Sequence, residues 1–323
     1  MIGLPAPTDV LGLDLGGTTV GAVRWSVTQA RVVNWVRART PTDGGAAGVV
    51  DTLARVMERL GGAQSAAAVG IASAGLVDAA TGRVLRAANL PGFDHPVPLL
   101  QLVGTRLARE YPHPEPVTLA LDNDVNALTR AEATYGAAAD GRDSLVIALG
   151  TGVGGGLVLG GRVRLGPRGF SGEIGHVVVQ PGGRPCSCGG YGHLEAYLGR
   201  SALEREARDR HDRGRHSLLV DLAGDRRMSS SIWDRALDAG DELALTLRLE
   251  AASALSVAIT QAATLLDIEQ VVLAGGFAPI LGRPFRAEVD RQLAVMSVAG
   301  APAVRAAALG DQAGAIGAAL LVA

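Results

Sequence analysis

The sequence contains one arrangement twice: an apolar, strand-like run that ends in a turn of glycine and threonine. Residues 10–15 lead into Gly16-Gly17-Thr18, and residues 144–149 lead into Gly150-Thr151-Gly152. Further strand-like segments follow each turn, at 20–27 and 31–39 in the first copy and at 157–159 and 162–165 in the second. This repeat predicts a duplicated α/β fold of two lobes around a central cleft.

Hydrophobic periodicity places the remaining elements. We expect strands at 67–72, 117–121 and 271–274, and helices at 46–60, 98–111, 201–219, 241–266 and 314–323. Residues 166–195 lack periodicity and predict an ordered loop. We therefore expect a small N-terminal lobe over 1–121, joined by the C-terminal helix at about 310–323, and a large lobe over 122–309.

Composition excludes several classes of protein. The net charge is -2, so no basic field would attract nucleic acid. The chain has no lysine, which excludes a P-loop lysine and a Schiff-base lysine. Two cysteines make no disulfide framework, so we expect a cytoplasmic protein. The first ten residues do not resemble a leader, and no apolar run reaches the ~18 residues of a membrane span.

The first turn has the residues of a phosphate-binding site. The amides of Gly16 and Gly17 can point at phosphate oxygens, and Thr18 adds a hydroxyl. Asp14 has the charge to hold a Mg²⁺-bound water. The alternative is a plain β-hairpin with a glycine-rich turn.

The second turn has the same character. Gly150, Thr151, Gly152 and Gly154 belong to a run of glycine and threonine directly after a strand, and Gly275-Gly276 follows a later strand. A sharp corner with several positive-φ residues is the alternative. One such turn in each half favours two lobes that bind a nucleotide. Although the letters from Gly150 spell Gly-x-Gly-x-x-Gly, a Rossmann fold is disfavoured, because strand-like residues follow where a helix should begin.

Asp122-Asn123-Asp124 stands where a strand ends and a helix begins. One of these residues can cap the helix, which is the structural alternative. Three together exceed what a cap needs. A carboxylate beside a phosphate-binding cleft can deprotonate an alcohol nucleophile.

The two cysteines lie two residues apart, between two histidines. His176, Cys186, Cys188 and His193 are the residue types that form closed tetrahedral zinc sites. The alternative is two unpaired cysteines and two surface histidines. The surrounding loop has little apolar content, so a structural zinc ion would explain its order.

The motifs, taken in order, resemble those of the ROK family (repressors, open reading frames, sugar kinases), and most of all its bacterial ATP-dependent glucokinases. The resemblance runs from Asp14 to about Gly276. It rests on the segments 14–18, 70–78, 89–92, 122–127, 150–156, 172–176 and 186–195.

The resemblance implies the actin-like ATPase fold of hexokinases and Hsp70, with ATP·Mg²⁺ as donor and a hexose as acceptor. By matching position, Asp124 is the general base. Sugar hydroxyls are then bound by Asn89, Asn123, Asp124, Glu173, His176 and Glu195. We expect a homodimer or homotetramer that binds neither nucleic acid nor membrane.

The sequence also departs from the family's pattern. Thr19 stands where Lys or Asn is usual, which alters phosphate or lobe contacts. Ala74 replaces a proline, and Phe93 a tryptophan. His193 replaces a third cysteine, so the metal site has one negative charge fewer but stays chemically competent.

Three alternatives remain for function. The acceptor can be another hexose, such as N-acetylmannosamine, fructose or allose. The donor can be polyphosphate. The chain can also be a sugar-responsive transcriptional regulator, although the short stretch before Asp14 leaves little room for a helix-turn-helix domain.

Overall fold

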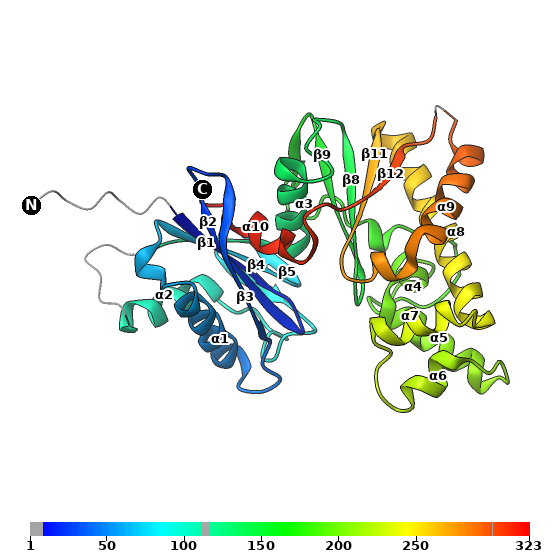
Figure 1. Ribbon diagram of the computed structural model, residues 1–323, viewed down its shortest axis with the longest axis horizontal. Helices are drawn as coiled ribbons and strands as arrows, with labels where there is room; N and C mark the ends of the chain where they lie inside the picture. Colours follow the sequence, from blue (N-terminus) through cyan, green and yellow to red (C-terminus); the bar gives the residue numbers. More distant parts are fainter. Residues whose placement is uncertain (1–8, 111–116, 299) are drawn as a thin grey trace, which may run out of the picture. The chain divides into compact units, whose positions relative to one another are not determined.

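The computed structural model describes residues 9–110, 117–298 and 300–323. It divides into two compact units (Figure 1). The first consists of residues up to 136 with 165–169 and 311–323, and the second of 137–164 and 170–310. Residues 1–8, where no leader is expected, and Tyr111, the expected end of a helix, lie outside the described residues.

The first unit is built on a five-stranded sheet. Its strands are β1 (Asp9–Leu15), β2 (Thr19–Ser26), β3 (Arg31–Arg39), β4 (Ala68–Ser73) and β7 (Thr118–Asn123). They lie in the order β3-β2-β1-β4-β7. The first three strands form the predicted antiparallel meander, and β4 and β7 run parallel to β1. A separate hairpin pairs β5 (Leu76–Asp78) with β6 (Arg83–Arg86).

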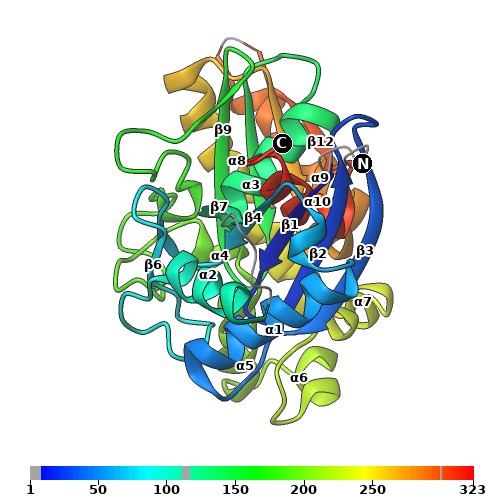
Figure 2. The same cartoon turned by 90° about the vertical axis from the view of Figure 1, so that its left-hand side faces the viewer.

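Helices cover both faces of this sheet (Figures 1 and 2). On one face lie α1 (Gly45–Arg59) and α2 (Leu99–Glu110), and on the other lie α3 (Asp124–Tyr135) and α10 (Ala313–Ala319). Gly12 and Gly70 let α10 approach closely, because a Cβ at either position would overlap the backbone of that helix. The C-terminal helix therefore packs on the N-terminal sheet, as the sequence predicts.

Helix α3 belongs to the first unit, whereas the sequence pattern predicts that the second lobe begins at residue 122. The reason is its packing against α10. Gly317 of α10 allows this contact, since a Cβ there would overlap the backbone of Ala127 on α3. The chain leaves the first unit only after Gly136.

The second unit repeats the topology of the first. Its sheet contains β8 (Ser144–Leu149), β9 (Val153–Leu159), β10 (Arg162–Arg164), β11 (Gln270–Ala274) and β12 (Ala303–Ala306), in the order β10-β9-β8-β11-β12. Again three strands form an antiparallel meander and two run parallel to its first strand. The predicted duplication is thus confirmed. The prediction that the second strand begins at residue 157 is wrong, because Gly154–Gly156 are part of β9.

Six helices and a short 3₁₀ turn, η2 (Ile174–His176), complete the described part of the second unit. The helices are α4 (Glu195–Leu198), α5 (Arg200–Asp212), α6 (Leu218–Ala223), α7 (Ser230–Asp238), α8 (Glu242–Leu266) and α9 (Ala278–Met296). The single helix predicted over 201–219 is wrong. Gly214 adopts a φ of 91° and separates α5 from α6.

Helix α8 is the described helix that is long and apolar enough to cross a membrane by length and composition. In the structure it is a core helix. Leu247, Leu255 and Ile259 are buried against the sheet and the neighbouring helices of the second unit. Burial inside the protein therefore accounts for its apolar character.

Candidate functional site

The candidate site residues of the first unit lie at one edge of its sheet. Asp14 of β1 pairs in register with Ala72 of β4, and Ala72 pairs with Asp122 of β7. These three strands are parallel, so their carboxyl ends meet at the same edge. Ligands of open α/β sheets bind at this edge.

The turn between β1 and β2 is anchored by Thr40. The Thr40 hydroxyl donates to the Gly16 carbonyl at 2.6 Å, and its amide donates to the Thr18 carbonyl at 3.0 Å. Gly17 and Thr18 are exposed at the tip. Gly17 lies directly against Asn89, since a Cβ on this glycine would overlap the Asn89 side chain. The structure thus brings the predicted phosphate turn beside a predicted sugar contact.

The three residues of the Asp122-Asn123-Asp124 segment make different contacts. Asn123 caps α3: its Oδ1 accepts from the amides of Val125 at 2.8 Å and Asn126 at 3.2 Å. Its Nδ2 donates to the Gly75 carbonyl at 3.0 Å, which leaves one amide hydrogen for a ligand. Asp124 is the first residue of α3 and accepts from the Val125 amide at 2.9 Å.

Asp122 has a structural role that its place in the sequence motif does not predict. It is 5% exposed. Its carboxylate accepts from Arg130 at 3.0 Å and from the Asn126 side chain at 3.1 Å. Asn126 and Arg130 follow it by four and eight residues, so they lie on one face of α3, and this spacing is the signal that could have identified the group.

Asp14 has an unusual pKa. Its partial burial, followed by repulsion from Asp124, raises the pKa from 3.8 to about 7. Gly314 of α10 lies against this carboxylate, and a Cβ there would overlap it. Because the carboxylates of Asp14 and Asp124 repel each other, a cation bound near both would be stabilised.

The raised pKa of Asp14 predicts a pH-dependent stability. Between about pH 4 and pH 7 the folded protein holds a proton that the unfolded chain has lost, so stability falls as the pH rises through this window. Asp14→Asn removes the carboxyl group whose ionisation lowers the stability of the folded protein. Urea unfolding should show the variant more stable than the wild type at pH 8, by about 2 kcal/mol after allowance for partial exposure, and similar at pH 4. A difference that is the same at both pH values would contradict this assignment.

In the second unit two glycine turns lie side by side. Strands β8 and β11 are adjacent and parallel, and they end at Gly150-Thr151-Gly152 and Gly275-Gly276. Gly275 has a φ of 84°, and a Cβ at this position would also overlap the backbone of Leu149. The start of α5 closes the first turn: the Arg200 amide donates to Gly150 at 3.1 Å, and the Ser201 amide donates to Thr151 at 3.0 Å. Gly154 instead lies within β9, opposite Ala148.

The four predicted metal ligands lie together. Ligand atoms of His176, Cys186, Cys188 and His193 are all within 4.8 Å of one another. The Sγ atom of Cys188 is 3.1 Å from Nδ1 of His193. In a tetrahedral zinc site the ligand atoms are about 3.3–3.8 Å apart, so a small contraction accommodates the ion.

Local backbone bonds hold these ligands in place. The Cys186 amide donates to the Gly190 carbonyl at 2.8 Å, which closes a tight turn around Cys188. His193 pairs in an isolated bridge with Val178, which lies two residues after His176. Burial raises the pKa of the Cys186 thiol, and the nearby Glu195 acts in the same direction. A cation is therefore the group that would stabilise its thiolate.

The three predicted sugar contacts of the second unit differ in their surroundings. Glu173 and His176 are exposed at the two ends of η2. Glu195 instead has both oxygens engaged. Oε2 accepts from the Val153 amide at 3.0 Å, and Oε1 accepts from the Ser187 hydroxyl at 2.9 Å.

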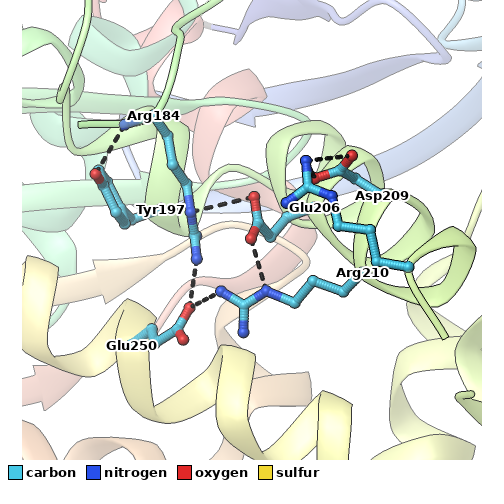
Figure 3. Close-up of polar contacts among 7 residues, drawn as sticks. Arg184, Tyr197, Glu206, Asp209, Arg210 and Glu250 are labelled. Carbon is cyan, nitrogen blue, oxygen red and sulfur yellow. Dashed lines mark hydrogen bonds and ion pairs between the residues drawn. The ribbon is translucent and has the colours of Figure 1, made fainter. Parts of the chain in front are cut away.

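A ring of ion pairs fastens the metal loop to the helices (Figure 3). Arg184 bonds Glu250 of α8 and lies 3.3 Å from Glu206 of α5. Arg210 closes the ring, at 2.6 Å from Glu206 and 2.8 Å from Glu250. The Arg184 guanidinium also stacks on Tyr197, whose hydroxyl accepts from the Arg184 amide at 2.9 Å. The loop is thus attached to α4, α5 and α8.

Glu250 should contribute measurably to stability. Burial would raise its pKa, but hydrogen bonds from Arg210 and Arg184 outweigh burial and lower the pKa. The contribution is therefore present at pH 7 and is lost as the pH falls below the ordinary range of a glutamate. Glu250→Gln should lower the free energy of unfolding at pH 7 by about 1–2 kcal/mol, discounted for exposure.

The matched control is Asp209→Asn, which breaks the exposed pair with Arg213. Exposed pairs contribute little, so urea unfolding of this variant should match the wild type. Equal losses in the two variants would contradict a special role for the ring.

The site residues are thus distributed over both units. The first contains Asp14, Gly16, Gly17, Thr18, Asn89, Asn123 and Asp124, and the second contains the other predicted site residues. Of the departures, Phe93 is buried in the core of the first unit, and Thr19 begins β2.

Comparison with known proteins identifies the family. The family model described as "ROK family" matches residues 10–323. A glucokinase of Thermotoga maritima is 33% identical, over 97% of this chain and 96% of that protein. A ROK hexokinase from Thermus thermophilus is 33% identical, with a TM-score of 0.77 and 97% of each chain covered. A ROK family glucokinase from Streptomyces griseus, solved with glucose and AMPPNP, is 30% identical, with a TM-score of 0.79, covering 97% of this chain and 98% of that one.

These matches span nearly the whole chain, and the two sheets have the repeated topology expected of an actin-like ATPase fold. The duplicated α/β fold predicted from the two glycine turns is confirmed, and so is the actin-like ATPase fold that the family resemblance implies. The chain belongs to the ROK family.

Proposed function

We propose that this protein is an ATP-dependent glucokinase, which transfers the γ-phosphate of ATP to the 6-hydroxyl of glucose. The observation that carries the proposal is the 30% identity, over 97% of the chain, to a structure that holds glucose and AMPPNP. The placement of Asp124 beside Asp14, at the ligand-binding edge of the first sheet, supports it.

Asp124 would act as the general base. It begins α3, where Asn123 and the buried Asp122 hold the backbone. A carboxylate in that position can accept the proton of a sugar hydroxyl as the oxygen attacks the γ-phosphorus. The bond from the γ-phosphorus to the β,γ-bridging oxygen breaks as the new P–O bond forms, and ADP leaves with that oxygen.

Asp14 would serve the magnesium ion of the nucleotide. Bound Mg²⁺ neutralises charge that develops on the transferring phosphoryl group. Asp14 would hold a water of that ion, and binding would release the proton that its raised pKa retains. The turns Gly16–Thr18 and Gly150–Gly152, with Gly275-Gly276, would supply amides to the phosphates.

The Cys/His group would bind one structural zinc ion. His176, Cys186, Cys188 and His193 fill all four positions of a tetrahedral site, so the ion orders the loop and activates no water. The ordered loop carries Glu173, His176 and Glu195, which we assign to the sugar side of the site together with Asn89 and Asn123. Cytoplasmic location and a homodimer or homotetramer stay predictions.

The test is a coupled ADP-release assay with glucose, N-acetylmannosamine, fructose and allose, using ATP and then polyphosphate as donor. The proposal predicts the highest kcat/KM for glucose with ATP. A higher kcat/KM for another hexose, or for polyphosphate, would reassign the substrate within the family. No sugar-dependent turnover with either donor would refute the kinase assignment.

A further inference from the structure

Glu195 connects two parts of the second unit that have different ligands. Oε2 accepts from the amide of Val153, the first residue after the turn Gly150–Gly152. Oε1 accepts from the hydroxyl of Ser187, the residue between the two cysteines, and lies 3.8 Å from Cys186 Sγ. One carboxylate therefore joins the predicted nucleotide turn to the predicted metal turn.

The fit around Glu195 is close. Gly152 packs against the carboxylate, and a Cβ on this glycine would overlap Glu195 Oε2. Gly199, at the other end of α4, also packs against the Glu195 side chain and against Gly152. A shift of this carboxylate would thus move an acceptor away from the backbone at the base of the turn.

Ser187 is the hydrogen-bond donor to the second oxygen. Its neighbours on both sides, Cys186 and Cys188, are predicted metal ligands, so its backbone is fixed when the ion is bound. Ser187 itself is exposed and has no part in the metal site. The Ser187 hydroxyl donates to a carboxylate. Hydrogen bonds to a charged acceptor are stronger than those between neutral groups.

We propose that Ser187 is a positioning residue: through Glu195 it couples the metal turn to the turn Gly150–Gly152, so that metal occupancy raises the affinity for ATP. The inference rests on the proposed function, which assigns the nucleotide to that turn. It adds a role in nucleotide binding to a loop that otherwise serves the sugar. Metal loss would weaken ATP binding as well as glucose binding.

The experiment measures the Kd of AMPPNP·Mg²⁺ by isothermal titration, with metal content determined on the same samples. Ser187→Ala, with its metal retained, should raise this Kd about threefold to tenfold. The KM of glucose should change less, and thermal stability should stay near that of the wild type, because the substituted residue is exposed. Ser187→Thr keeps the hydroxyl and should restore the wild-type Kd.

Metal removal completes a thermodynamic cycle. Chelation should raise the nucleotide Kd of the wild type, and should raise that of Ser187→Ala by a smaller factor, because the connection is already broken. If chelation unfolds the protein, the metal-bound Ser187→Ala and Ser187→Thr variants still decide the question.

The outcomes separate the two proposals. Wild-type protein that binds nucleotide while Ser187→Ala binds it equally well would overturn this inference alone. A glucose KM that changes while the nucleotide Kd does not would also overturn it, since Glu195 would then act on the sugar only. Metal-bound wild-type protein that binds no nucleotide would overturn the proposed function and this inference together.

Discussion

Asp124→Asn should lower kcat by about 10²–10⁴, the range typical for loss of a general base. The substitution keeps the shape of the side chain and removes its capacity to accept a proton. The KM of glucose and the Kd of AMPPNP should change little, because the proposed loss is confined to the transition state. Steady-state kinetics and nucleotide titration measure the two effects separately.

Asn123→Ala is the informative comparison. It removes the cap of α3, which accepts two backbone amides. Loss of a cap costs about 1 kcal/mol of stability. This variant should therefore lose stability, whereas Asp124→Asn should lose kcat at near-normal stability. An Asp124→Asn protein with kcat within twofold of the wild type would refute its role as base.

Cys188→Ser should lose the metal, destabilise the protein and raise the KM of glucose together. Metal binding energy is also ordering energy for this loop, which carries Glu173, His176 and Glu195. A loss of even about 3 kcal/mol corresponds to a fall in Tm of roughly 6–12 °C for a unit of this size. Elemental analysis, differential scanning calorimetry and kinetics on one preparation provide the three readouts.

His193→Cys is the matched control, because it replaces a neutral nitrogen ligand with a thiolate. The site keeps four ligands, so metal, Tm and glucose KM should all be retained. Purified, active wild-type protein that contains no zinc would contradict the site. So would a Cys188→Ser variant that loses its metal without a change in Tm.

The sequence predicts best those features for which the local residue types allow few other structures. Strands that end in glycine turns gave the repeated meander, and both copies are present. The Cys/His spacing brought four ligand atoms together as expected. In each case the local chemistry allows few alternatives.

Helices and strands without a regular hydrophobic pattern are not predicted from the sequence. Helix α9 has a non-helical Gly282 and contains Pro284, which hid its pattern. Strand β12 has four residues, none of them buried, so it shows no hydrophobic run. It forms only because β11 offers an edge to pair with. Such pairing depends on tertiary structure and has no signal in the segment itself.

Side-chain roles that depend on partners far away along the chain also cannot be predicted from the sequence. The family resemblance implies a sugar contact for Glu195, but its bond to the amide of Val153, 42 residues away, depends on the tertiary fold. The ring that includes Arg184 and Glu250 joins residues 66 positions apart. Charge alone does not reveal which of many arginines and glutamates will pair.

The most direct test is product formation from glucose and ATP·Mg²⁺ by the purified protein. Glucose 6-phosphate can be followed by coupled reduction of NADP⁺, and ADP measured in the same sample. The account predicts equal amounts of the two products in the wild type and a rate lower by about 10²–10⁴ in Asp124→Asn. ADP release without glucose 6-phosphate, or equal rates in the two proteins, would contradict it.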